Sequence, residues 1–471
     1  MNDFKKFFKG KKITLMGLGL LGRGVGDASF LAECGAKLTV TDLKTKEQLK
    51  ESLDKLKKYE KPAKGRAGIK YVLGEHRLED FRNCDLVLKN SDIRPDSIYI
   101  KEAQKHNIPV EMSASLFVKL SGLPTIAVTG TRGKSTVTHL IAHILESSGK
   151  KIVLGGNVRG VSNLQLLKKF TPPELGGANK AEAAVFELDS WQLRGFGESK
   201  MSPNISVFTT FFPDHMGYYK GSMEKYFADK ANIFKYQKKN DFLIIGKQAL
   251  PFIKKWQKKN KEKIKSKIII GKERLPKLKN KRWKLNLPGV HNEYNAMLAV
   301  EVAGILSIPD AKIKKALKTF TSLPGRLQFL RNVKGIKIYN DNSSTTPDAT
   351  IAALRAVGDK NKRKVVLIMG GDNKFLDMRK LLAEIPKFCS KVVLFKERGT
   401  DTIRDKVFDF KKKGIEVYEE ENLQNTVKRA FQIAKRGETI LYSPAFFSFG
   451  KHFKNEFDRG DQFVKIVKSL K

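Results

Sequence analysis

The chain has 471 residues, of which 41% are hydrophobic and 30% charged, a composition typical of a folded protein with about two to four domains. No apolar stretch reaches the roughly 18 residues needed to cross a bilayer, and the basic N-terminus lacks the apolar core of a signal peptide. We therefore expect a cytoplasmic protein without membrane insertion. Cys34, Cys84 and Cys389 are far apart and odd in number, which argues against a disulfide framework or a metal motif.

The formal net charge of +42 has three possible origins. The chain could bind nucleic acid, its substrates could all be anions drawn in by a positive field, or lysine could simply be its default surface residue. Much of the excess lies in stretches such as "KKWQKKNKEKIKSK", where few aromatic residues are available to stack on bases. We favour a lysine-rich surface with anionic substrates as a contributor, and we expect no specific nucleic-acid partner.

The first block, residues 1–120, begins with the pattern strand, glycine turn, helix and second strand. In "MGLGLLGRGVGD", Gly17, Gly19 and Gly22 fit the G-x-G-x-x-G spacing of dinucleotide sites, and Asp42 ends the next strand, where it could contact a ribose. The spacing alone leaves open NAD, another nucleotide diphosphate, or a structural turn.

The second block, residues 121–323, opens with "IAVTGTRGKSTVTHL", an apolar strand, a glycine loop and a helix. Gly130 and Gly133 allow the backbone N–H groups to point inward, and the helix adds its positive N-terminus. Lys134 can reach the β- and γ-phosphates, and the hydroxyl of Ser135 or Thr136 can bind Mg²⁺. Val128 stands where the strict motif has its first glycine, so we interpret the loop as a shorter nucleoside-triphosphate variant.

Two further strands of this block end in residues suited to a metal site. Glu187 ends the strand in "FELDSWQL", and His215 follows another in "FFPDHMGYY". In a parallel sheet both strand ends face the glycine loop, so a carboxylate and an imidazole there could bind or orient Mg²⁺. Lys230, in "YFADKANIF", is one of many lysines, and its spacing gives it no distinction.

The third block, residues 324–471, follows a boundary turn, "TSLPGRLQ", and contains apolar strands such as "IKIYNDN", "KVVLIMGG" and "TILYSPA". It predicts a second open α/β unit. Ligands of such sheets bind at the carboxyl ends of the strands, where this block places its glycine and polar residues.

These motifs, in the order "GLGLLGRG", "TGTRGKST", "ELDSWQL", "YFADKANIF", "LPGVHNEYN", "NDNSSTTPDAT" and "SPAFFS…FKNEFDRGDQF", resemble the Mur ligases over nearly the whole chain. The resemblance is greatest to the members that add D-glutamate. It implies an α/β chain of three domains: a Rossmann-like UDP-sugar domain (1–120), a central P-loop ATPase-type parallel sheet for ATP (121–323) and a Rossmann-like amino-acid domain (324–471).

The resemblance also implies an activity. It is ATP- and Mg²⁺-dependent ligation of D-glutamate to UDP-N-acetylmuramoyl-L-alanine (UDP-MurNAc-L-Ala) through an acyl phosphate, in peptidoglycan precursor synthesis, by a monomer. Two alternatives stay open: another amino-acid ligase of the superfamily, such as a folylpolyglutamate synthase, and a basic ATP-dependent nucleic-acid-binding protein.

By resemblance, four groups of residues acquire expected roles. The UDP-sugar would contact Gly17, Leu18, Leu20, Asp42, Leu43 and Asn157. ATP would contact Gly130, Thr131, Arg132, Gly133, Lys134, Ser135, Thr136, Asn292, Asn295, Arg326 and Asp341. The metal would be held by Ser135, Glu187, His215 and a carbamylated Lys230, so that Lys134, Glu187, His215 and Lys230 form the catalytic set. The amino acid would contact Thr345, Lys374, Ser448 and Phe457.

The chain departs from the family pattern at three places. Ser343 stands where relatives carry a lysine, Gly325 stands where they carry a histidine before the arginine, and "FFSFGKHFKN" is one residue longer than usual. These differences bear mainly on the amino-acid specificity.

Overall fold

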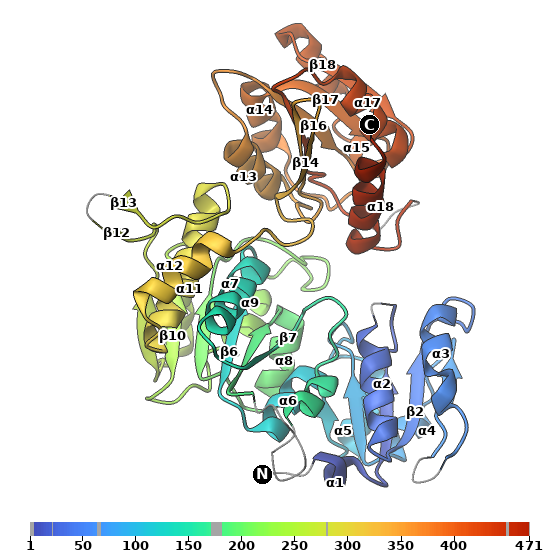
Figure 1. The fold of residues 1–471 in the computed structure, drawn as a ribbon. Helices are drawn as coiled ribbons and strands as arrows, with labels where there is room; N and C mark the ends of the chain where they lie inside the picture. Colours follow the sequence, from blue (N-terminus) through green and yellow to red (C-terminus); the bar gives the residue numbers. More distant parts are fainter. Residues whose placement is uncertain are drawn as a thin grey trace. The chain divides into compact units, whose positions relative to one another are not determined.

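The computed structural model describes residues 4–20, 22–63, 67–170, 181–278, 281–448 and 452–470 (Figure 1). The chain divides into two compact units, each described by itself: unit 1 holds Met1–Arg282 and Asn295–Leu317, and unit 2 holds Trp283–Tyr294 and Lys318–Lys471. Within the described ranges, no helix is both long and apolar enough to cross a membrane.

The first sheet of unit 1 is parallel, with strand order β3-β2-β1-β4-β5. Its strands are β1 (Lys12–Met16), β2 (Lys37–Asp42), β3 (Lys70–Leu73), β4 (Leu86–Lys89) and β5 (Val110–Glu111). The helices of this part of the chain are α1 (Phe4–Phe8), α2 (Arg23–Glu33), α3 (Lys50–Leu56), α4 (Leu78–Arg82), α5 (Ile98–Lys105) and α6 (Ser113–Ser121). The order reverses between β1 and β4, which opens a crevice at the carboxyl ends of these two strands.

The second sheet of unit 1 is also parallel, with order β11-β10-β9-β6-β8-β7. Its strands are β6 (Thr125–Thr129), β7 (Ile152–Gly156), β8 (Ala183–Glu187), β9 (Ile205–Phe208), β10 (Phe242–Ile245) and β11 (Lys267–Ile270). Its helices are α7 (Lys134–Ser147), η2 (Leu164–Phe170), α8 (Ser190–Glu198), α9 (Met223–Ala231) and α10 (Leu250–Asn260). A short hairpin, β12 (Lys277–Leu278) and β13 (Lys281–Arg282), precedes α11 (Val290–Ile305) and α12 (Asp310–Thr319). β6 is fully buried and lies between β9 and β8 in the middle of this sheet. The glycine loop that follows β6 therefore begins at the centre of the sheet.

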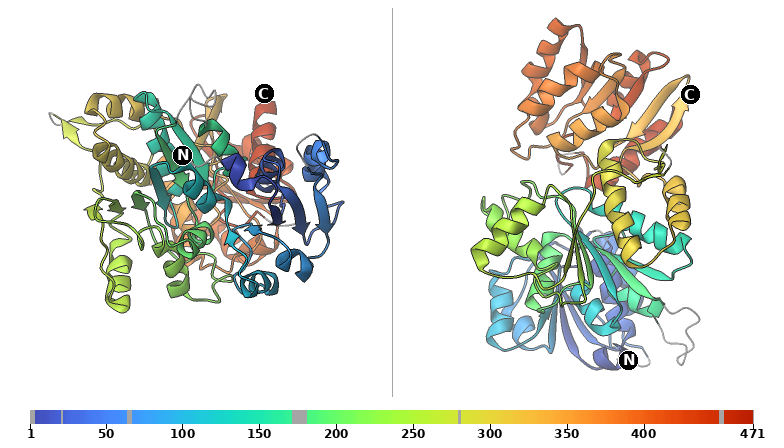
Figure 2. Two further views of the ribbon diagram at one scale, coloured as in Figure 1. Left: turned by 90° about the horizontal axis from the view of Figure 1, so that it is seen from below. Right: turned by 90° about the vertical axis from the view of Figure 1, so that its left-hand side faces the viewer.

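The sheet of unit 2 has the order β14-β15-β19-β16-β17-β18. Its strands are β14 (Gln328–Val333), β15 (Ile336–Asn340), β16 (Val365–Met369), β17 (Cys389–Phe395), β18 (Glu416–Glu420) and β19 (Thr439–Tyr442). Its helices are α13 (Pro347–Val357), α14 (Arg379–Phe388), α15 (Arg398–Asp401), α16 (Arg404–Phe408), η4 (Asp409–Lys413), α17 (Leu423–Ile433) and α18 (Glu456–Ser469). Helices cover both faces of this sheet, as two further views show (Figure 2). β16 lies in the core of this unit, since all five of its residues are buried.

The expected α/β class with parallel sheets is confirmed, but some strands were not predicted. β14 runs antiparallel to β15 along the edge of its sheet, and its mostly half-exposed residues give no clean alternation of apolar and polar side chains. The three large sheets lie within residues 12–111, 125–270 and 328–442, and the compact units group the first two together. Domain boundaries at residues 120 and 323 stay a prediction.

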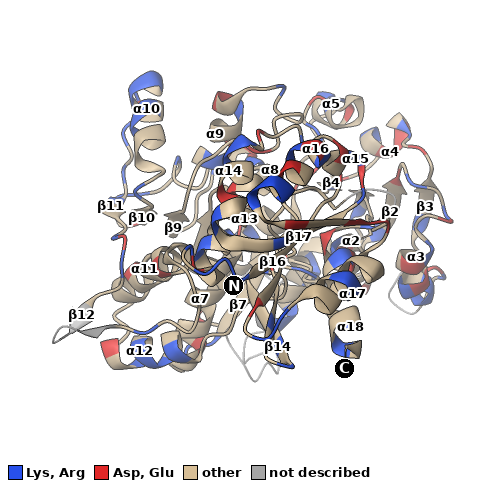
Figure 3. Cartoon of the chain, turned by 90° about the horizontal axis from the view of Figure 1, so that it is seen from above, with Lys and Arg blue, Asp and Glu red and all other residues tan. Residues whose placement is uncertain are grey.

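Basic residues are spread over both units rather than gathered on one element (Figure 3). Lysines recur on α10, in "LPFIKKWQKKN", on α12, in "DAKIKKALKT", and on η4, in "DFKKK". No single helix therefore carries the net charge, and the pattern resembles a solvated lysine surface more than a nucleic-acid groove.

A small cluster of polar residues links α2, which belongs to the first sheet, to the segment that follows β7 of the second sheet. The Ser162 hydroxyl donates to Asp27 Oδ1 at 2.5 Å, and Gln165 Nε2 donates to the carbonyl of Gly26 at 3.0 Å. Gly26 permits this approach, because a Cβ there would lie 2.4 Å from Ser162 Cβ. Burial raises the pKa of Asp27 to about 6, although hydrogen bonds from Ser162 and the N–H of Leu164 partly oppose the shift.

Asp27→Asn should remove a pH dependence from the stability of unit 1. A carboxyl whose pKa rises from 3.8 to about 6 on folding costs nothing below the lower value. Its penalty then grows to on the order of 3 kcal/mol as pH rises past the upper one. Asn keeps the acceptor oxygen without the charge, so urea unfolding should show a gain over wild type at pH 7.5 that vanishes near pH 4. Asp54→Asn, at an exposed position of α3, is the matched control. A constant difference between Asp27→Asn and wild type at all pH values would contradict this account.

Candidate active site

The glycine loop after β6 is fastened to the end of β9. The backbone N–H of Thr131 donates to the carbonyl of Thr210 at 2.7 Å, and the N–H of Arg132 donates to the Thr210 hydroxyl at 2.9 Å. Gly130 has φ +140°, and a Cβ there would lie 2.0 Å from the Thr209 hydroxyl oxygen. Glycine is therefore required by space as well as by backbone angle.

The loop leads directly into α7, whose N-terminus adds a positive dipole to the loop amides. Lys134 is the first residue of the helix, and its Nζ folds back to within 3.3 Å of the carbonyl of Thr131. Ser135 and Thr136 are each 9% exposed in the first turn. Backbone amides, a helix N-terminus, an ammonium group and two hydroxyls are thus brought together where the sequence predicts a phosphate site.

Asn295 closes the other side of the loop. Gly133 has φ +85°, and a Cβ there would lie 2.4 Å from Asn295 Oδ1. Asn295 stands on α11 and is 7% exposed. The structure thus brings one of the expected adenine-contacting residues against the phosphate loop, from more than 150 positions away in the sequence.

Lys230 is a deeply buried lysine beside the glycine loop. It is 1% exposed on α9, and its Nζ donates to the carbonyl of Gly130 at 2.9 Å and lies 4.9 Å from the centre of the Tyr226 ring. Burial, followed by repulsion from Lys134, lowers the pKa of Lys230 to about 7, against the opposing effect of three aspartates. A substantial fraction of this amine is neutral and nucleophilic at neutral pH.

The two expected metal-binding side chains follow β8 and β9, the strands on either side of β6. Glu187, at the end of β8, is 4% exposed, and its carboxylate accepts no hydrogen bond from any side chain or amide that the structure describes. Its backbone carbonyl accepts from the N–H of Asn157 at 2.7 Å. A carboxylate at the end of a strand next to the glycine loop is a ligand type that Mg²⁺ prefers.

His215 follows β9 with φ +55°, and its ring lies 4.8 Å from that of Trp191, centre to centre. Burial lowers the pKa of His215, Asp214 opposes this, and Lys230 and Lys134 lower it further, so the neutral, metal-binding form is favoured. Across the described ranges no group of three His, Cys, Asp or Glu side chains converges as a metal site. Any cation here would therefore need hydroxyl, phosphate or carbamate oxygens as well.

The glycine turn of the first sheet is organised by Asp42. One oxygen of its buried carboxylate accepts from the N–H groups of Leu18 and Gly19, at 2.9 and 3.0 Å, and the other accepts from the N–H of Lys44. Asp42 therefore orders the turn, and the amide of Leu18, a residue expected at the UDP-sugar, is already hydrogen-bonded within the protein. Leu20 and Leu43 are 50% and 64% exposed beside the turn and offer apolar surface to a ligand.

One residue of this crevice was missed. Asn90 directly follows β4, and a Cβ on Gly17 would lie 2.9 Å from Asn90 Nδ2. The side-chain amide thus covers the glycine turn at the point where strand order reverses. The signal was present, since Asn90 ends the predicted strand "CDLVLKN" as Glu187 ends its own.

The expected amino-acid site lies within unit 2, at the carboxyl ends of β15, β16 and β19. Lys374 Nζ donates to the Thr345 hydroxyl at 3.1 Å and lies 5.1 Å from the centre of the Phe447 ring. Ser448 is 2% exposed, and its hydroxyl finds no partner among the atoms described. Phe457 is half-buried in the first turn of α18, and Phe449, Gly450 and Lys451, within the longer loop, are outside the described residues.

The remaining expected ATP residues belong to unit 2. Asp341 is buried, accepts from the N–H of Leu327 and the hydroxyl of Ser443, and has its pKa raised to about 6 by burial. Asn292 donates to the carbonyl of Pro288 at 2.7 Å, and Arg326 is exposed.

Two of the departures from the family pattern touch one another. The N–H of Ser343 donates to the carbonyl of Gly325 at 2.8 Å. A Cβ on Gly325 would lie 3.2 Å from the Ser343 hydroxyl oxygen, so the small residue at each position suits the other.

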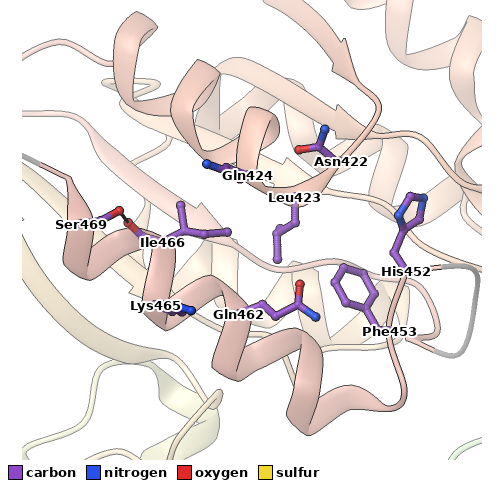
Figure 4. A pocket seen from close by; sticks show the side chains of 9 residues that line it. All are labelled: Asn422, Leu423, Gln424, His452, Phe453, Gln462, Lys465, Ile466 and Ser469. Carbon is purple, nitrogen blue, oxygen red and sulfur yellow. Dashed lines mark hydrogen bonds between the residues drawn. The ribbon is translucent and has the colours of Figure 1, made fainter.

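A separate hollow of about 560 Å³ lies between α17 and α18 in unit 2 (Figure 4). It contains none of the expected site residues and is lined by Asn422, Leu423, Gln424, His452, Phe453, Gln462, Lys465, Ile466 and Ser469.

Comparisons with known proteins agree with this arrangement. A sequence profile described as the Mur ligase middle domain matches residues 128–303, and one described as the Mur ligase, glutamate ligase domain, matches residues 325–446. A UDP-N-acetylmuramoylalanine–D-glutamate ligase of Borreliella afzelii (strain PKo) is 34% identical, with 98% of each chain covered. One of Roseiflexus sp. (strain RS-1) is 32% identical, covering 98% of this chain and 99% of its own.

Solved structures give the same fold. UDP-N-acetylmuramate–alanine ligase of Thermotoga maritima superposes with a TM-score of 0.61 at 20% identity, covering 98% of this chain and 100% of its own. Folylpolyglutamate synthase of Mycobacterium tuberculosis gives 0.53 at 15% identity, covering 76% and 96%. With full-length relatives above 30% identity and the phosphate loop, buried lysine and strand-end carboxylate in place, the chain belongs to the Mur ligase family.

Proposed function

We propose that the protein joins D-glutamate to UDP-MurNAc-L-Ala, using ATP and forming an acyl phosphate on the substrate carboxylate, as a step of peptidoglycan precursor synthesis. The observation that carries the proposal is the full-length similarity to relatives named UDP-N-acetylmuramoylalanine–D-glutamate ligase. The separate strand-end sites for a nucleotide, a phosphate chain and an anionic amino acid support it.

The residues around the glycine loop fit phosphoryl transfer. A carboxylate is a poor electrophile, and phosphorylation gives it a leaving group that an incoming amine can displace. The loop amides and Lys134 would hold the transferred phosphoryl group and offset its charge, so the protein contributes mainly position and electrostatics. Three anionic substrates would otherwise repel one another.

Mg²⁺ fits the chemistry of the donor set, a carboxylate at the end of β8, an imidazole after β9 and a hydroxyl in the first turn of α7. The Ser135 hydroxyl, the Glu187 carboxylate and the His215 imidazole would hold the ion together with phosphate oxygens. When bound, Mg²⁺ would neutralise part of the charge on the phosphates.

Lys230 suits carbamylation, the reaction of its neutral amine with CO₂ to form N–CO₂⁻ with release of a proton. Burial excludes water, the lowered pKa leaves the amine free to attack, and the product would turn a buried cation into an anion that a metal stabilises. We propose that this carbamate completes the metal site.

The first experiment is phosphate release with ATP, Mg²⁺, UDP-MurNAc-L-Ala and a panel of amino acids. We expect release that requires the nucleotide sugar and is largest with D-glutamate, with L-glutamate and D-aspartate as controls for chirality and length. Equal release without the nucleotide sugar, or stimulation by RNA or DNA instead, would reject the proposal.

Lys134→Ala should keep the fold and lose turnover by about 10²–10³-fold, because one well-placed cation near the developing charge contributes about 3–4 kcal/mol. The measurement is kcat beside the thermal unfolding midpoint. Lys150→Ala, beyond the other end of α7 in an exposed ion pair with Glu182, is the matched control and should retain activity. Wild-type turnover by Lys134→Ala would remove Lys134 from the mechanism.

Lys230 should take up one CO₂ per chain, at a rate that rises with pH through about 7, where the amine loses its proton. Chemical trapping of the carbamate followed by mass spectrometry would detect it, and activity should fall on bicarbonate depletion and return on its addition. Lys230→Arg cannot form the adduct and should be inactive, whereas Lys235→Arg, at the end of the same segment, should not. Full activity without bicarbonate, together with an unmodified Lys230, would disprove carbamylation.

A further inference from the structure

Phe375 is unusual both in the exposure of its side chain and in its backbone conformation. It is 90% exposed, the highest value among the large hydrophobic residues that the structure describes, where the next is 64%. Its φ of +56° lies in the left-handed region, which a bulky residue rarely enters and glycine enters freely. Among the described residues of unit 2, no ring contact or core cluster includes Phe375.

The backbone around Phe375 is held rather than loose. Its N–H donates to Asn373 Oδ1 at 2.7 Å, so a side-chain-capped turn fixes the left-handed position. The turn follows β16 and begins at Gly370 and Gly371, whose φ values of +137° and +150° let the chain pass close to neighbouring strands. A strained residue that its surroundings hold in place is a candidate for function.

Phe375 directly follows Lys374, the cation of the expected amino-acid site. Lys374 Nζ lies 3.1 Å from the Thr345 hydroxyl oxygen, and the nearby Ser448 hydroxyl is buried without a partner. An ammonium and two hydroxyls at one strand edge suit a carboxylate, and the unpartnered hydroxyl shows that the site has an unused hydrogen-bonding group.

We propose that Phe375 is a specificity residue whose ring closes over the side chain of an acidic amino acid held by Lys374. The inference rests on the proposed ligase function and deepens it, since it assigns the binding of the amino acid alone. The ring would cover the methylene groups of the ligand and exclude water, which strengthens the attraction between Lys374 and the carboxylate. The exposure of Phe375 without ligand and its held backbone then have one explanation.

The test compares Phe375→Gly, Phe375→Ala and Phe375→Leu by steady-state kinetics and thermal unfolding. For Phe375→Gly we expect KM for D-glutamate to rise about tenfold or more, with kcat and the KM values of ATP and UDP-MurNAc-L-Ala nearly unchanged. Its unfolding midpoint should stay equal or rise, because glycine relieves the left-handed backbone. Phe375→Leu should restore part of the affinity, and KM for D-glutamate should depend more steeply on salt in Phe375→Ala than in wild type.

Phe329→Ala is the matched control, since Phe329 is a 49% exposed aromatic residue on β14 of the same unit. It should leave KM for D-glutamate unchanged. An unchanged KM in Phe375→Ala would overturn the inference while leaving the ligase function intact, as would a loss of stability and kcat without a selective change in KM. A wild-type protein that never uses D-glutamate would instead reject the proposed function, and this inference with it.

Discussion

The close approach of the Gly130 backbone to the end of β9 is the constraint on which the site depends. With 2.0 Å between a hypothetical Cβ and the Thr209 hydroxyl oxygen, no side chain fits, and the loop can be fastened through Thr131 and Arg132. That fastening fixes the carbonyl of Gly130, and the carbonyl in turn receives Lys230. One contact between neighbouring strand ends therefore positions the loop amides, Lys134 and Lys230 together.

Charged side chains lie around the glycine loop, some partly exposed and some buried. Arg132 at the loop pairs with Asp214 at 3.0 Å, Lys230 is buried behind the loop, and the Glu187 carboxylate has no donor among the described atoms. Removing a charge from water is costly unless a partner compensates it, which is why burial lowers the pKa of Lys230 to about 7. A nucleotide with its cation has the charges that would complete this arrangement.

The sequence predicted those parts of the fold and site that local chemistry specifies. The strand–loop–helix pattern predicted the glycine loop between β6 and α7, and the apolar strand pattern predicted Glu187 at the end of β8, because both signals lie within a few neighbouring residues. Lys230 could not be distinguished by pattern, since its burial and the contact of its Nζ with the carbonyl of Gly130 arise from tertiary packing. The contact of Asn295 with Gly133 has the same character, because it joins segments far apart in the chain.

Some functional groups were assigned to a ligand but are used by the protein itself. The spacing of Asp42 fits a ribose contact. Its carboxylate nevertheless accepts hydrogen bonds from three backbone N–H groups, two in the glycine turn after β1 and one just after β2. β14 was missed because its half-exposed residues carry no alternation. Spacing identifies residue types suited to a task, but only the fold decides whether their hydrogen-bonding capacity is still available.

Unused capacity is therefore the more informative signal, and unit 2 shows the contrast within a few residues. Arg459 is fully buried, and its guanidinium donates to Asn342 Oδ1 at 2.7 Å and to the carbonyls of Asn342 and Phe447, both at 3.1 Å. Such a satisfied group is a support that holds the strand-end loops in place. Ser448, which follows β19, has a buried hydroxyl with no partner among the described atoms, and Phe375 is 90% exposed. Because a stable fold rarely retains such costs without compensation, the ligand of this edge should be a molecule that accepts or donates a hydrogen bond at Ser448 and offers apolar surface to Phe375.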